Sequence, residues 1–457
     1  MNDIAIVNGK VVTPSEIFEA CIGIEGGKVT NISRSPRNSS GRTIDASGLL
    51  IFPGFVDAHV HFREPAGPTD ESFLNGTKAA ASGGVTTIID MPGSKPGAVL
   101  TRHDLEQKKN SVKGKAVVDY ALFGAAGAQN LPFITEMADG GIVGYKTFMT
   151  SGPDYTAEDD ATLLQVFEAI SKTGLVSAVH AEVAKLVNLF SKRLEEQGEN
   201  SPQAHPRSRP NLFENLAIER VIALSQSCGA RAHIVHMSTA EGCKMVAASK
   251  KKGYAVTAET CPHYLLLTEE AMSKLGPYAK INPPLRAKRD QEALWHSLRN
   301  GVIDFIASDH APHTLSDKEP GWTNIWKARA GNPGLETMAM LILTKCREGI
   351  LDYTRAARLM SENPARVYGL FPRKGTISIG SDADFTIVDP NKKTRLEKDK
   401  MISMSRFGTL YDGWETSVSP SYTIVRGEVV AEGWEVTGTP GSGVFLSANR
   451  PTTAFTH

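Results

Sequence analysis

The feature of this sequence that most constrains its fold is a series of eight short apolar runs, each followed by a stretch with the spacing of an amphipathic helix. Alternating strand-like and helix-like segments predict βα units and a parallel sheet. Eight such units predict an α/β fold, a (β/α)8 TIM barrel, over residues 51–373. An open doubly wound sheet is the alternative, but the Gly-rich fingerprint of its dinucleotide-binding form is absent after the first run. The runs span 55–61, 85–90, 117–123, 143–148, 175–180, 232–236, 254–259 and 303–309.

Both ends of the chain show a sequence pattern different from that of the middle. Residues 1–50 and 374–457 contain short segments in which apolar and polar residues alternate, broken by Gly, Asn-Gly and Pro turn signals. Neither end is large enough to bury a good core alone. We therefore expect both ends to fold together into one small β-sandwich domain beside the barrel. Two long polar connections, 191–210 and 314–333, interrupt the barrel pattern and are candidate lids.

The composition argues against several classes of partner. The 457 residues include 50 Lys and Arg and 50 Asp and Glu, so the formal net charge is zero and gives no overall attraction to nucleic acid or to an anionic membrane. No apolar stretch is long enough to span a bilayer, and the N-terminus lacks the pattern of a signal peptide. The five cysteines are widely spaced and form no CxxC pair, which favours the reducing cytoplasm. We expect a cytoplasmic protein that binds neither nucleic acid nor membrane.

The strongest chemical signal is a set of polar residues at or near the ends of the apolar runs. Catalytic groups of a TIM barrel lie at the carboxyl ends of its strands. Residues i and i+2 of a strand share a face, so His59 and His61 can hold one ion together. One histidine at a strand end is more often an ordinary hydrogen-bonded residue, but six polar groups at one end of a barrel indicate a metal centre. The six are His59, His61, Lys146, His180, His236 and Asp309.

Lys146 is the unusual member of this set, because an ammonium group cannot bind a metal and is repelled by one. Its neighbours in GIVGYKTFM are apolar or small, and nothing in them argues for a side chain that reaches solvent. Reaction of the neutral amine with carbon dioxide would give a carbamate, whose two oxygens could each touch one of two metals about 3.5 to 4 Å apart. Carboxylated Lys146 is therefore a hypothesis. Asp309 ends an apolar run and is suited to bind a metal or to shuttle a proton.

Many of these segments resemble the cyclic amidohydrolases of the amidohydrolase superfamily, a group that includes hydantoinases, dihydropyrimidinases, allantoinases and type I dihydroorotases. The resemblance covers essentially the whole chain and rests on GFVDAHVHFREP, AASGGVTTIIDMP, VGYKTFM, AVHAE, IVHMS, ETCPHYLLLT, NPPLR and ASDHAPH. It implies a centre of two divalent metal ions, zinc, with carboxylated Lys146 as the bridge. His59, His61 and Asp309 would bind the first metal, and His180 and His236 the second. It also implies that a hydroxide between the metals attacks the ring carbonyl while Asp309 passes its proton to the leaving nitrogen.

The resemblance also suggests substrate contacts, and these do not agree on one substrate. Arg63, Asn282 and His313 match the pattern of dihydroorotases, in which an arginine pairs with the carboxylate of the substrate. Against this, Gly93 replaces an asparagine of those enzymes and Ala330 replaces a phenylalanine. FMTSG and SRPNLFENLAIERVI look more like allantoinases and hydantoinases, although Ser151 stands where D-selective hydantoinases carry a tyrosine. The candidate substrate contacts are Arg63, Ser151, Asn282, His313 and Gly331.

These expectations describe an enzyme, a metal-dependent hydrolase that opens the carbon–nitrogen bond of a small cyclic amide. An allantoin-like or hydantoin-like ring is the first candidate substrate, and dihydroorotate is the alternative. The superfamily also contains non-catalytic scaffold relatives that lose metal ligands, but all six ligand positions are retained in this sequence. The resemblance further implies a homo-oligomer, either a tetramer or a dimer.

Overall fold

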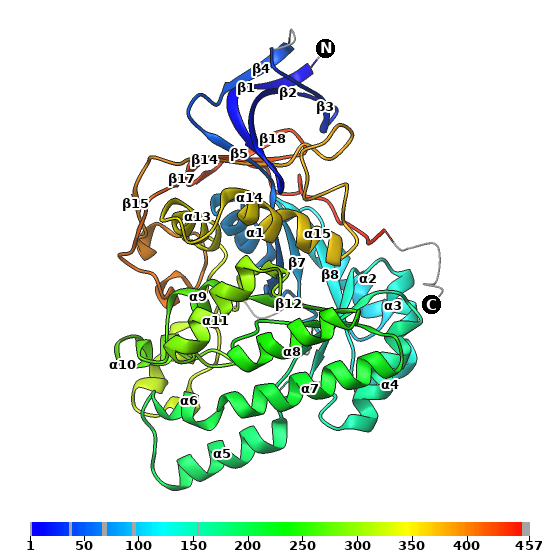
Figure 1. Ribbon diagram of the computed structural model, residues 1–457, viewed down its shortest axis with the longest axis vertical. Helices are drawn as coiled ribbons and strands as arrows, with labels where there is room; N and C mark the ends of the chain where they lie inside the picture. Colours follow the sequence, from blue (N-terminus) through cyan, green and yellow to red (C-terminus); the bar gives the residue numbers. More distant parts are fainter. Residues whose placement is uncertain (1, 36–38, 66–70, 94–96, 153–154, 450–457) are drawn as a thin grey trace.

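The computed structural model describes residues 2–35, 39–65, 71–93, 97–152 and 155–449. Within them, eight parallel strands pair in the order of the sequence, and each predicted apolar run overlaps one of them. The first strand meets the chain just beyond the last one, because His61 N donates to His310 O at 2.8 Å. The predicted TIM barrel is thus confirmed as a nearly closed barrel (Figure 1). Its strands are β6 (Phe55–Val60), β7 (Val85–Asp90), β8 (Asp119–Ala125), β9 (Gly144–Phe148), β10 (Val176–His180), β11 (Arg231–Ile234), β12 (Val256–Thr260) and β13 (Phe305–Ile306).

Helices between the strands cover the outside of the barrel, so its strands are buried on both faces. Local sequence fixes where several of these helices begin. Ser72 caps the first one, for example, because its Oγ accepts a hydrogen bond from Asn75 N at 3.1 Å. The longer helices are α1 (Phe73–Ser82), α2 (Arg102–Val112), α4 (Asp160–Ser171), α5 (Ala184–Glu196), α7 (Asn211–Ser227), α8 (Ala240–Lys251), α11 (Lys288–Arg299) and α13 (Met338–Arg347). Shorter ones are α3 (Ile134–Asp139), α6 (Ala204–Ser208), α9 (Pro262–Leu266), α10 (Ala271–Leu275), α12 (Leu315–Lys318), α14 (Tyr353–Ala357) and α15 (Asn363–Val367).

A separate apolar cluster fills the barrel itself. Side chains from several strands, among them Ala58, Phe123, Ala178 and Phe305, belong to one buried cluster. Only the interior of a barrel brings such residues of distant strands together. Tyr368, from the segment after α15, belongs to the same cluster. The barrel is therefore a packed core with its open cavity confined to one end.

The two ends of the chain form a second sheet, as predicted. Figure 1 shows it above the barrel, with blue N-terminal and orange C-terminal strands side by side. Strand β1 pairs with β2, β4 and β5, and β5 continues the sheet to β14. Residues from both parts share one buried core, as in a small sandwich. The strands are β1 (Asn2–Val12), β2 (Ile17–Glu25), β3 (Lys28–Ser33), β4 (Ser39–Asp45), β5 (Leu50–Pro53), β14 (Phe385–Asp389), β17 (Ser419–Val425), β18 (Glu428–Glu432) and β19 (Glu435–Val436), beside a separate pair, β15 (Thr394–Arg395) and β16 (Glu415–Thr416).

A buried cluster of charges joins the end sheet to the barrel. The Lys374 ammonium is fully buried and lies 2.5 Å from Asp119 Oδ2, 2.6 Å from Asp384 Oδ2 and 3.0 Å from Asp382 Oδ2. Asp119 begins β8, whereas Asp384 precedes β14 of the end sheet. Arg426 adds a second cation, with its Nε 3.1 Å from Asp119 Oδ2. These three carboxylates meet the geometric spacing of a metal site, but the lysine already occupies the space between them, so the cluster is structural.

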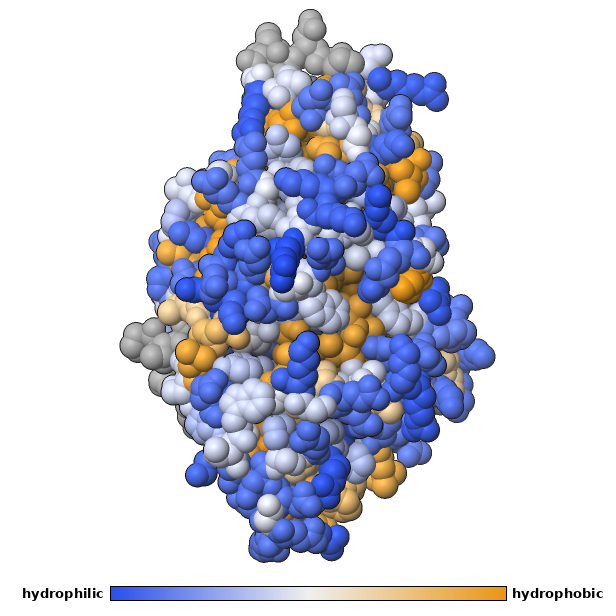
Figure 2. Space-filling view, turned by 90° about the vertical axis from the view of Figure 1, so that its left-hand side faces the viewer, coloured by the Kyte–Doolittle hydropathy of each residue, from blue (hydrophilic) through white to orange (hydrophobic). Residues whose placement is uncertain are grey.

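The surface matches the balanced composition. The face in Figure 2 is mainly hydrophilic, and its hydrophobic residues are gathered in separate patches. Within the described residues, no helix is both long and apolar enough to cross a membrane.

Candidate active site at the carboxyl ends of the barrel strands

A cavity of about 290 Å³ opens at the carboxyl ends of the barrel strands. It has the place expected for the active site of a TIM barrel. All six predicted metal ligands and all five predicted substrate contacts line it. They are His59, His61, Arg63, Lys146, Ser151, His180, His236, Asn282, Asp309, His313 and Gly331.

The two histidines of the first strand converge on one carboxylate. Asp309 Oδ1 lies 3.2 Å from His59 Nε2 and 3.4 Å from His61 Nε2. Burial lowers the pKa of His59 well below its usual value, and Lys146 lowers it further. Burial also lowers the pKa of His61, although Asp309 opposes this. Both imidazoles are therefore neutral at pH 7 and can offer a lone pair to a cation.

Lys146 comes from the middle of β9 and is completely buried. Its Nζ lies 3.2 Å from His59 Nε2 and 5.0 Å from the centre of the Phe148 ring. Burial lowers the pKa of Lys146 to about 8, while Asp309 and Glu259 act in the opposite direction. A measurable fraction of neutral amine is therefore present at neutral pH, as carbamate formation requires.

His180 and His236 form the other side of the site. Their rings are 4.6 Å apart, edge to face, and burial lowers the pKa of both. His180 Nε2 lies 2.8 Å from Glu182 Oε2, which leaves its Nδ1 as the atom that can bind a cation. Arg209 also pairs with Glu182 at 2.5 Å. Burial raises the pKa of Glu182, but Arg209 and His180 outweigh it and hold the pKa at about 2. The carboxylate therefore fixes the His180 ring.

Three residues of the cavity have an unusual backbone conformation. Arg63, His236 and Asp309 have φ angles of 57°, 38° and 49°, and they are three of only five described non-glycine residues with a positive φ. Such conformations cost energy and cluster at functional sites.

Burial raises the pKa of Asp309, but His61 outweighs this effect, and the pKa lies below its ordinary value. Asp309 is thus an ionised carboxylate aimed at two neutral histidines.

These side chains fit a divalent cation. His59, His61 and Asp309 offer ligand atoms that all lie within 4.8 Å of one another. His236 Nδ1 is buried and has no hydrogen-bond partner among the described residues. Neutral imidazoles and carboxylates are the ligands of catalytic zinc sites. The two imidazoles and the carboxylate of this group are hydrogen-bond acceptors that lie close together, and a bound cation would satisfy their lone pairs.

Arg63 and His313 lie on one wall of the cavity and are held by backbone carbonyls. Arg63 donates to Pro312 O, and His313 Nε2 lies 2.9 Å from Ala330 O. That bond places the proton of His313 on Nε2. Burial and the charge of Arg63 lower the pKa of His313 to about 2. His313 is therefore neutral and brings no second positive charge to this wall.

The other predicted substrate contacts differ in what they present to the cavity. Asn282 Oδ1 is buried without a partner among the described residues, so it is available to accept a hydrogen bond from a ligand. Gly331 has φ 136°, and a Cβ there would approach Ala311 O to 2.4 Å. Its backbone is therefore close-packed beside the site. Ser151 is exposed, and its Oγ contacts the side chains of Glu158 and Asn188.

Three residues close to the candidate metal ligands were not predicted from the sequence. Phe148 and Tyr155 line the cavity with rings 5.7 Å apart, and the Tyr155 hydroxyl donates to Gly93 O at 3.0 Å. Phe148 follows Lys146 by two residues on β9, so strand periodicity could have found it. Tyr155 comes from a loop and carries no such signal. Glu259 ends the seventh apolar run and was left without a role, although its carboxylate contacts His59 Nδ1.

The predicted lid 314–333 is held by hydrogen bonds within itself and to the neighbouring segment that contains Pro277 and Lys280. Lys318 Nζ donates to Arg329 O at 2.9 Å and to Pro277 O at 3.2 Å. Lys280 Nζ donates to Ile325 O and Ala328 O at 2.7 and 2.6 Å. The segment carries α12 and short turns of 3-10 helix. Its residues Arg329, Ala330 and Gly331 line the cavity.

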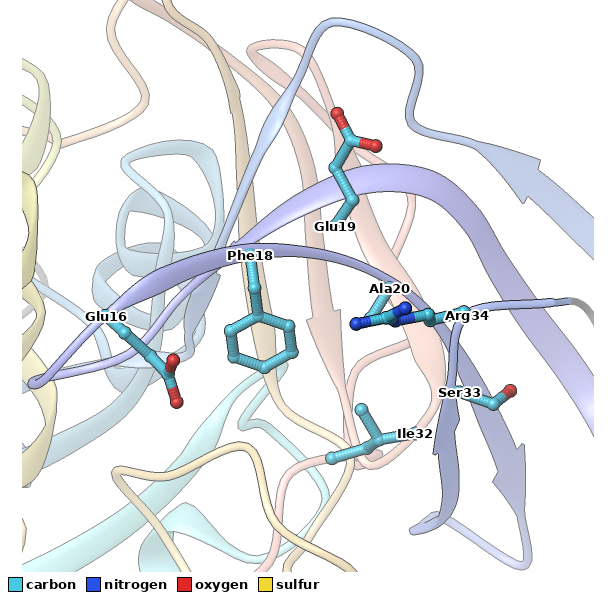
Figure 3. A pocket seen from close by; sticks show the side chains of 7 residues that line it. All are labelled: Glu16, Phe18, Glu19, Ala20, Ile32, Ser33 and Arg34. Atoms are coloured by element: carbon cyan, nitrogen blue, oxygen red, sulfur yellow. The ribbon is translucent and has the colours of Figure 1, made fainter.

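A wider hollow of about 710 Å³ lies on the end sheet, between β2 and β3 (Figure 3). Figure 3 shows the Phe18 and Ile32 side chains on one side of β2 with Glu16 and Arg34 beside them, whereas Glu19 points to the other side. Its lining contains no histidine or cysteine, and it lies away from the barrel mouth. The catalytic chemistry therefore belongs to the smaller cavity.

Comparison with known proteins agrees with this geometry. The Amidohydrolase family matches residues 50–430. The chain is 36% identical to an L-hydantoinase of Paenarthrobacter aurescens over 98% of both chains, and 34% identical to an allantoinase of Deinococcus radiodurans over 96% of this chain and 97% of that one. It is also 34% identical to a dihydroorotase of Methanosarcina acetivorans over 98% of this chain and 96% of that one. The solved structure of L-hydantoinase (dihydropyrimidinase) from Arthrobacter aurescens superposes with a TM-score of 0.94 over 98% of this chain and 100% of that chain, at 36% identity. The chain belongs to the amidohydrolase family.

Proposed function

We propose that this protein is a metal-dependent hydrolase that opens the carbon–nitrogen bond of a small cyclic amide, with an allantoin-like or hydantoin-like ring as substrate. The observation that carries the proposal is the convergence of six candidate metal ligands and five candidate substrate contacts on one cavity. Relatives named L-hydantoinase and allantoinase, which align over nearly the full chain, support the same reaction class. The cavity volume of about 290 Å³ is at the small end for ligand sites and suits a single ring.

The metal centre that we propose contains two divalent cations, zinc in the first instance. His59, His61 and Asp309 would hold one cation, His180 and His236 the other, and a carbamate formed on Lys146 would lie between them. When bound, such cations polarise a carbonyl group and make hydroxide available at neutral pH. The lowered pKa of Lys146 supports the carbamate, because only the neutral amine reacts with carbon dioxide.

In this mechanism the protein side chains move the proton and orient the ring. Asp309 is ionised, so it can accept the proton of the attacking water and return it to the nitrogen that leaves the carbonyl carbon. Asn282 Oδ1, which is buried without a partner among the described residues, would accept a hydrogen bond from a ring N–H. Phe148 and Tyr155 form an aromatic wall that covers one face of the ring. Arg63, which lies near His313, would hold a polar group of the substrate.

Dihydroorotate is the second candidate, and one set of observations favours it. Arg63, Asn282 and His313 all line the cavity, as a site for a substrate carboxylate would require. Two features favour a neutral ring instead. His313 is neutral and commits its Nε2–H to Ala330 O, and Gly93 offers no side chain to a carboxylate. The carbonyl of Gly93 accepts the hydroxyl group of Tyr155 instead.

A parallel hydrolysis assay tests the proposal. The purified enzyme, loaded with zinc, is given allantoin, hydantoin, 5-substituted hydantoins, dihydrouracil and dihydroorotate under identical conditions. We expect the highest kcat/KM for allantoin or a hydantoin. Turnover of dihydroorotate alone would overturn the choice of substrate, and no turnover of any cyclic amide would overturn the reaction class.

The proposal also covers the cellular compartment and the oligomeric state. We propose a cytoplasmic homo-oligomer, a tetramer or a dimer. All five cysteines are free thiols, which supports a reducing compartment. Sedimentation of the purified protein would give the oligomeric state directly.

A further inference from the structure

Glu259 is a buried carboxylate that the mechanism above does not use. It lies near the end of β12 and is completely buried. It does not line the cavity, so it cannot touch a substrate. Its two oxygens nevertheless contact groups that belong to the metal cluster or lie directly beneath it. Oε1 accepts from His59 Nδ1 and from the backbone N of His236 at 3.3 Å, and Oε2 lies 3.2 Å from His233 Nε2.

The contact with His59 determines which of its nitrogens carries the proton. A carboxylate only accepts hydrogen bonds, so Nδ1 of His59 must carry the hydrogen. His59 is a neutral imidazole and has a single ring N–H. Its Nε2 atom therefore offers a lone pair, and this atom lies 3.2 Å from both Lys146 Nζ and Asp309 Oδ1. The other tautomer would present an N–H to the metal cluster and could not bind a cation.

His233 continues the same chain of hydrogen bonds on the far side of Glu259. Its ring is fully buried and stacks on Phe305, with centroids 4.7 Å apart. His233 Nδ1 lies 2.8 Å from the hydroxyl oxygen of Thr257. If Thr257 donates to Nδ1, then Nε2 of His233 carries the proton that it gives to Glu259. Both oxygens of Glu259 are then occupied, and His59 and His233 both donate to this carboxylate.

We propose that Glu259 is a positioning residue that holds His59 in the one tautomer and ring orientation able to bind a divalent cation, with His233 and Thr257 locking the carboxylate in place. Partners of this kind behind a metal-binding histidine set its tautomer and raise its basicity. Glu259 also bonds to the backbone of His236, so one carboxylate links a ligand of each of the two cations. This inference rests on the proposed metal centre, and it names Glu259 as a residue that raises the affinity of that centre for its cations.

The test compares two buried carboxylates. Glu259→Leu removes the carboxylate behind the His59 ring. Asp57→Asn is the control, because Asp57 is equally buried on the strand of His59 but bonds to the backbone N–H groups of His59 and Ser308, at 3.2 and 3.1 Å, and to the Ser308 side chain rather than to a histidine ring. Zinc affinity is measured by competition with a chelator. We expect Glu259→Leu to lower it by about 10- to 100-fold and Asp57→Asn to leave it nearly unchanged.

A second readout observes the tautomer without metal or activity. Nitrogen-15 NMR of labelled histidines in the metal-free wild-type protein distinguishes a proton on Nδ1 from one on Nε2. The spectrum is recorded in alkaline buffer, where carboxyl groups are ionised. We expect His59 to carry its proton on Nδ1. This measurement decides the proposal even where Glu259→Leu fails to fold, and Glu259→Gln then serves as the milder variant for the zinc titration.

The outcomes separate this inference from the proposed function. A proton on Nε2 of His59 in the wild-type protein, or equal zinc affinity in Glu259→Leu and Asp57→Asn, would overturn the positioning role. If Glu259→Leu loses zinc affinity while the wild-type protein hydrolyses no cyclic amide, the positioning role would be supported and the proposed function overturned.

Discussion

Replacing Lys374 by methionine is expected to destabilise the protein more than any exposed lysine change. The ammonium is fully buried and lies within 3.0 Å of three carboxylates. After the substitution Asp119 keeps Arg426, and Asp382 keeps Lys28 and Arg373. Among the described residues, Asp384 then keeps only the backbone N–H of Arg426, at 2.8 Å. Removing one partner from a buried ion cluster costs about 3 to 5 kcal/mol, because a charge is left without compensation.

Lys28 supplies the matched control for this prediction. Its Nζ lies 2.6 Å from Asp382 Oδ1, as close as Lys374 lies to its partners, but the side chain is 45% exposed. An exposed pair contributes about 0 to 1 kcal/mol. Urea denaturation followed by circular dichroism would give the free energy of unfolding of both variants. The double variant Lys374→Met, Asp384→Asn should recover part of the loss, since it removes the orphaned charge.

The difference in the free energy of unfolding between the wild type and Lys374→Met depends on pH through the pKa of Lys374. Burial lowers that pKa, but Asp384, Asp119 and Asp382 outweigh it and raise the pKa above the ordinary 10.5. A group whose pKa is raised by folding stabilises the protein fully below the unfolded value. The wild type should therefore exceed Lys374→Met in free energy of unfolding by a constant amount at neutral pH, and this difference should shrink above pH 10.5. Equal, small losses in Lys374→Met and Lys28→Met would refute this account of the cluster.

Three further predictions concern activity and acid stability. Asp309→Asn should retain most of its metal, measured by elemental analysis, but lose about 100- to 10,000-fold in kcat; near-normal turnover would exclude the proton-shuttle role. Arg63→Ala should reduce kcat/KM for an anionic ring far more than for a neutral one, whereas equal losses would make Arg63 structural. Burial raises the pKa of Asp382, but Lys374 and Lys28 hold it at about 2, so its stabilising effect is present above pH 3.8 and is lost as the pH falls toward 2. Asp382→Asn should flatten that decline in melting temperature, and an unchanged acid profile would contradict the assignment.

The barrel and the residues proposed as metal ligands were predictable because both depend on short-range periodicity. Each buried strand is a continuous apolar run, and a polar residue at the end of such a run stands out against it. His59 and His61 share a face because they are two residues apart. The same reasoning extends to Phe148 after Lys146 and to Glu182 after His180. In such cases local sequence alone places the side chain.

Other parts of the site depend on contacts between distant segments and left no local signal. Tyr155 reaches Gly93 O across 62 positions of the sequence, and Arg63 reaches Pro312 O across 249. Lys374 and Asp119 are 255 residues apart. The lid-like segment 314–333 reads as a polar loop, but two buried lysines bind its backbone carbonyls, which hydropathy does not reveal. These features follow from tertiary packing.

The central claim, a two-metal centre bridged by a modified lysine, is tested most directly on the purified protein itself. Zinc is titrated into metal-free enzyme in the presence of carbon-13 bicarbonate, and the bound zinc and the carbon-13 NMR spectrum are recorded together. We predict two zinc ions per chain and one carbamate resonance that disappears in Lys146→Ala. Fewer than about one ion per chain, with no carbamate resonance in the wild-type protein, would contradict the binuclear centre.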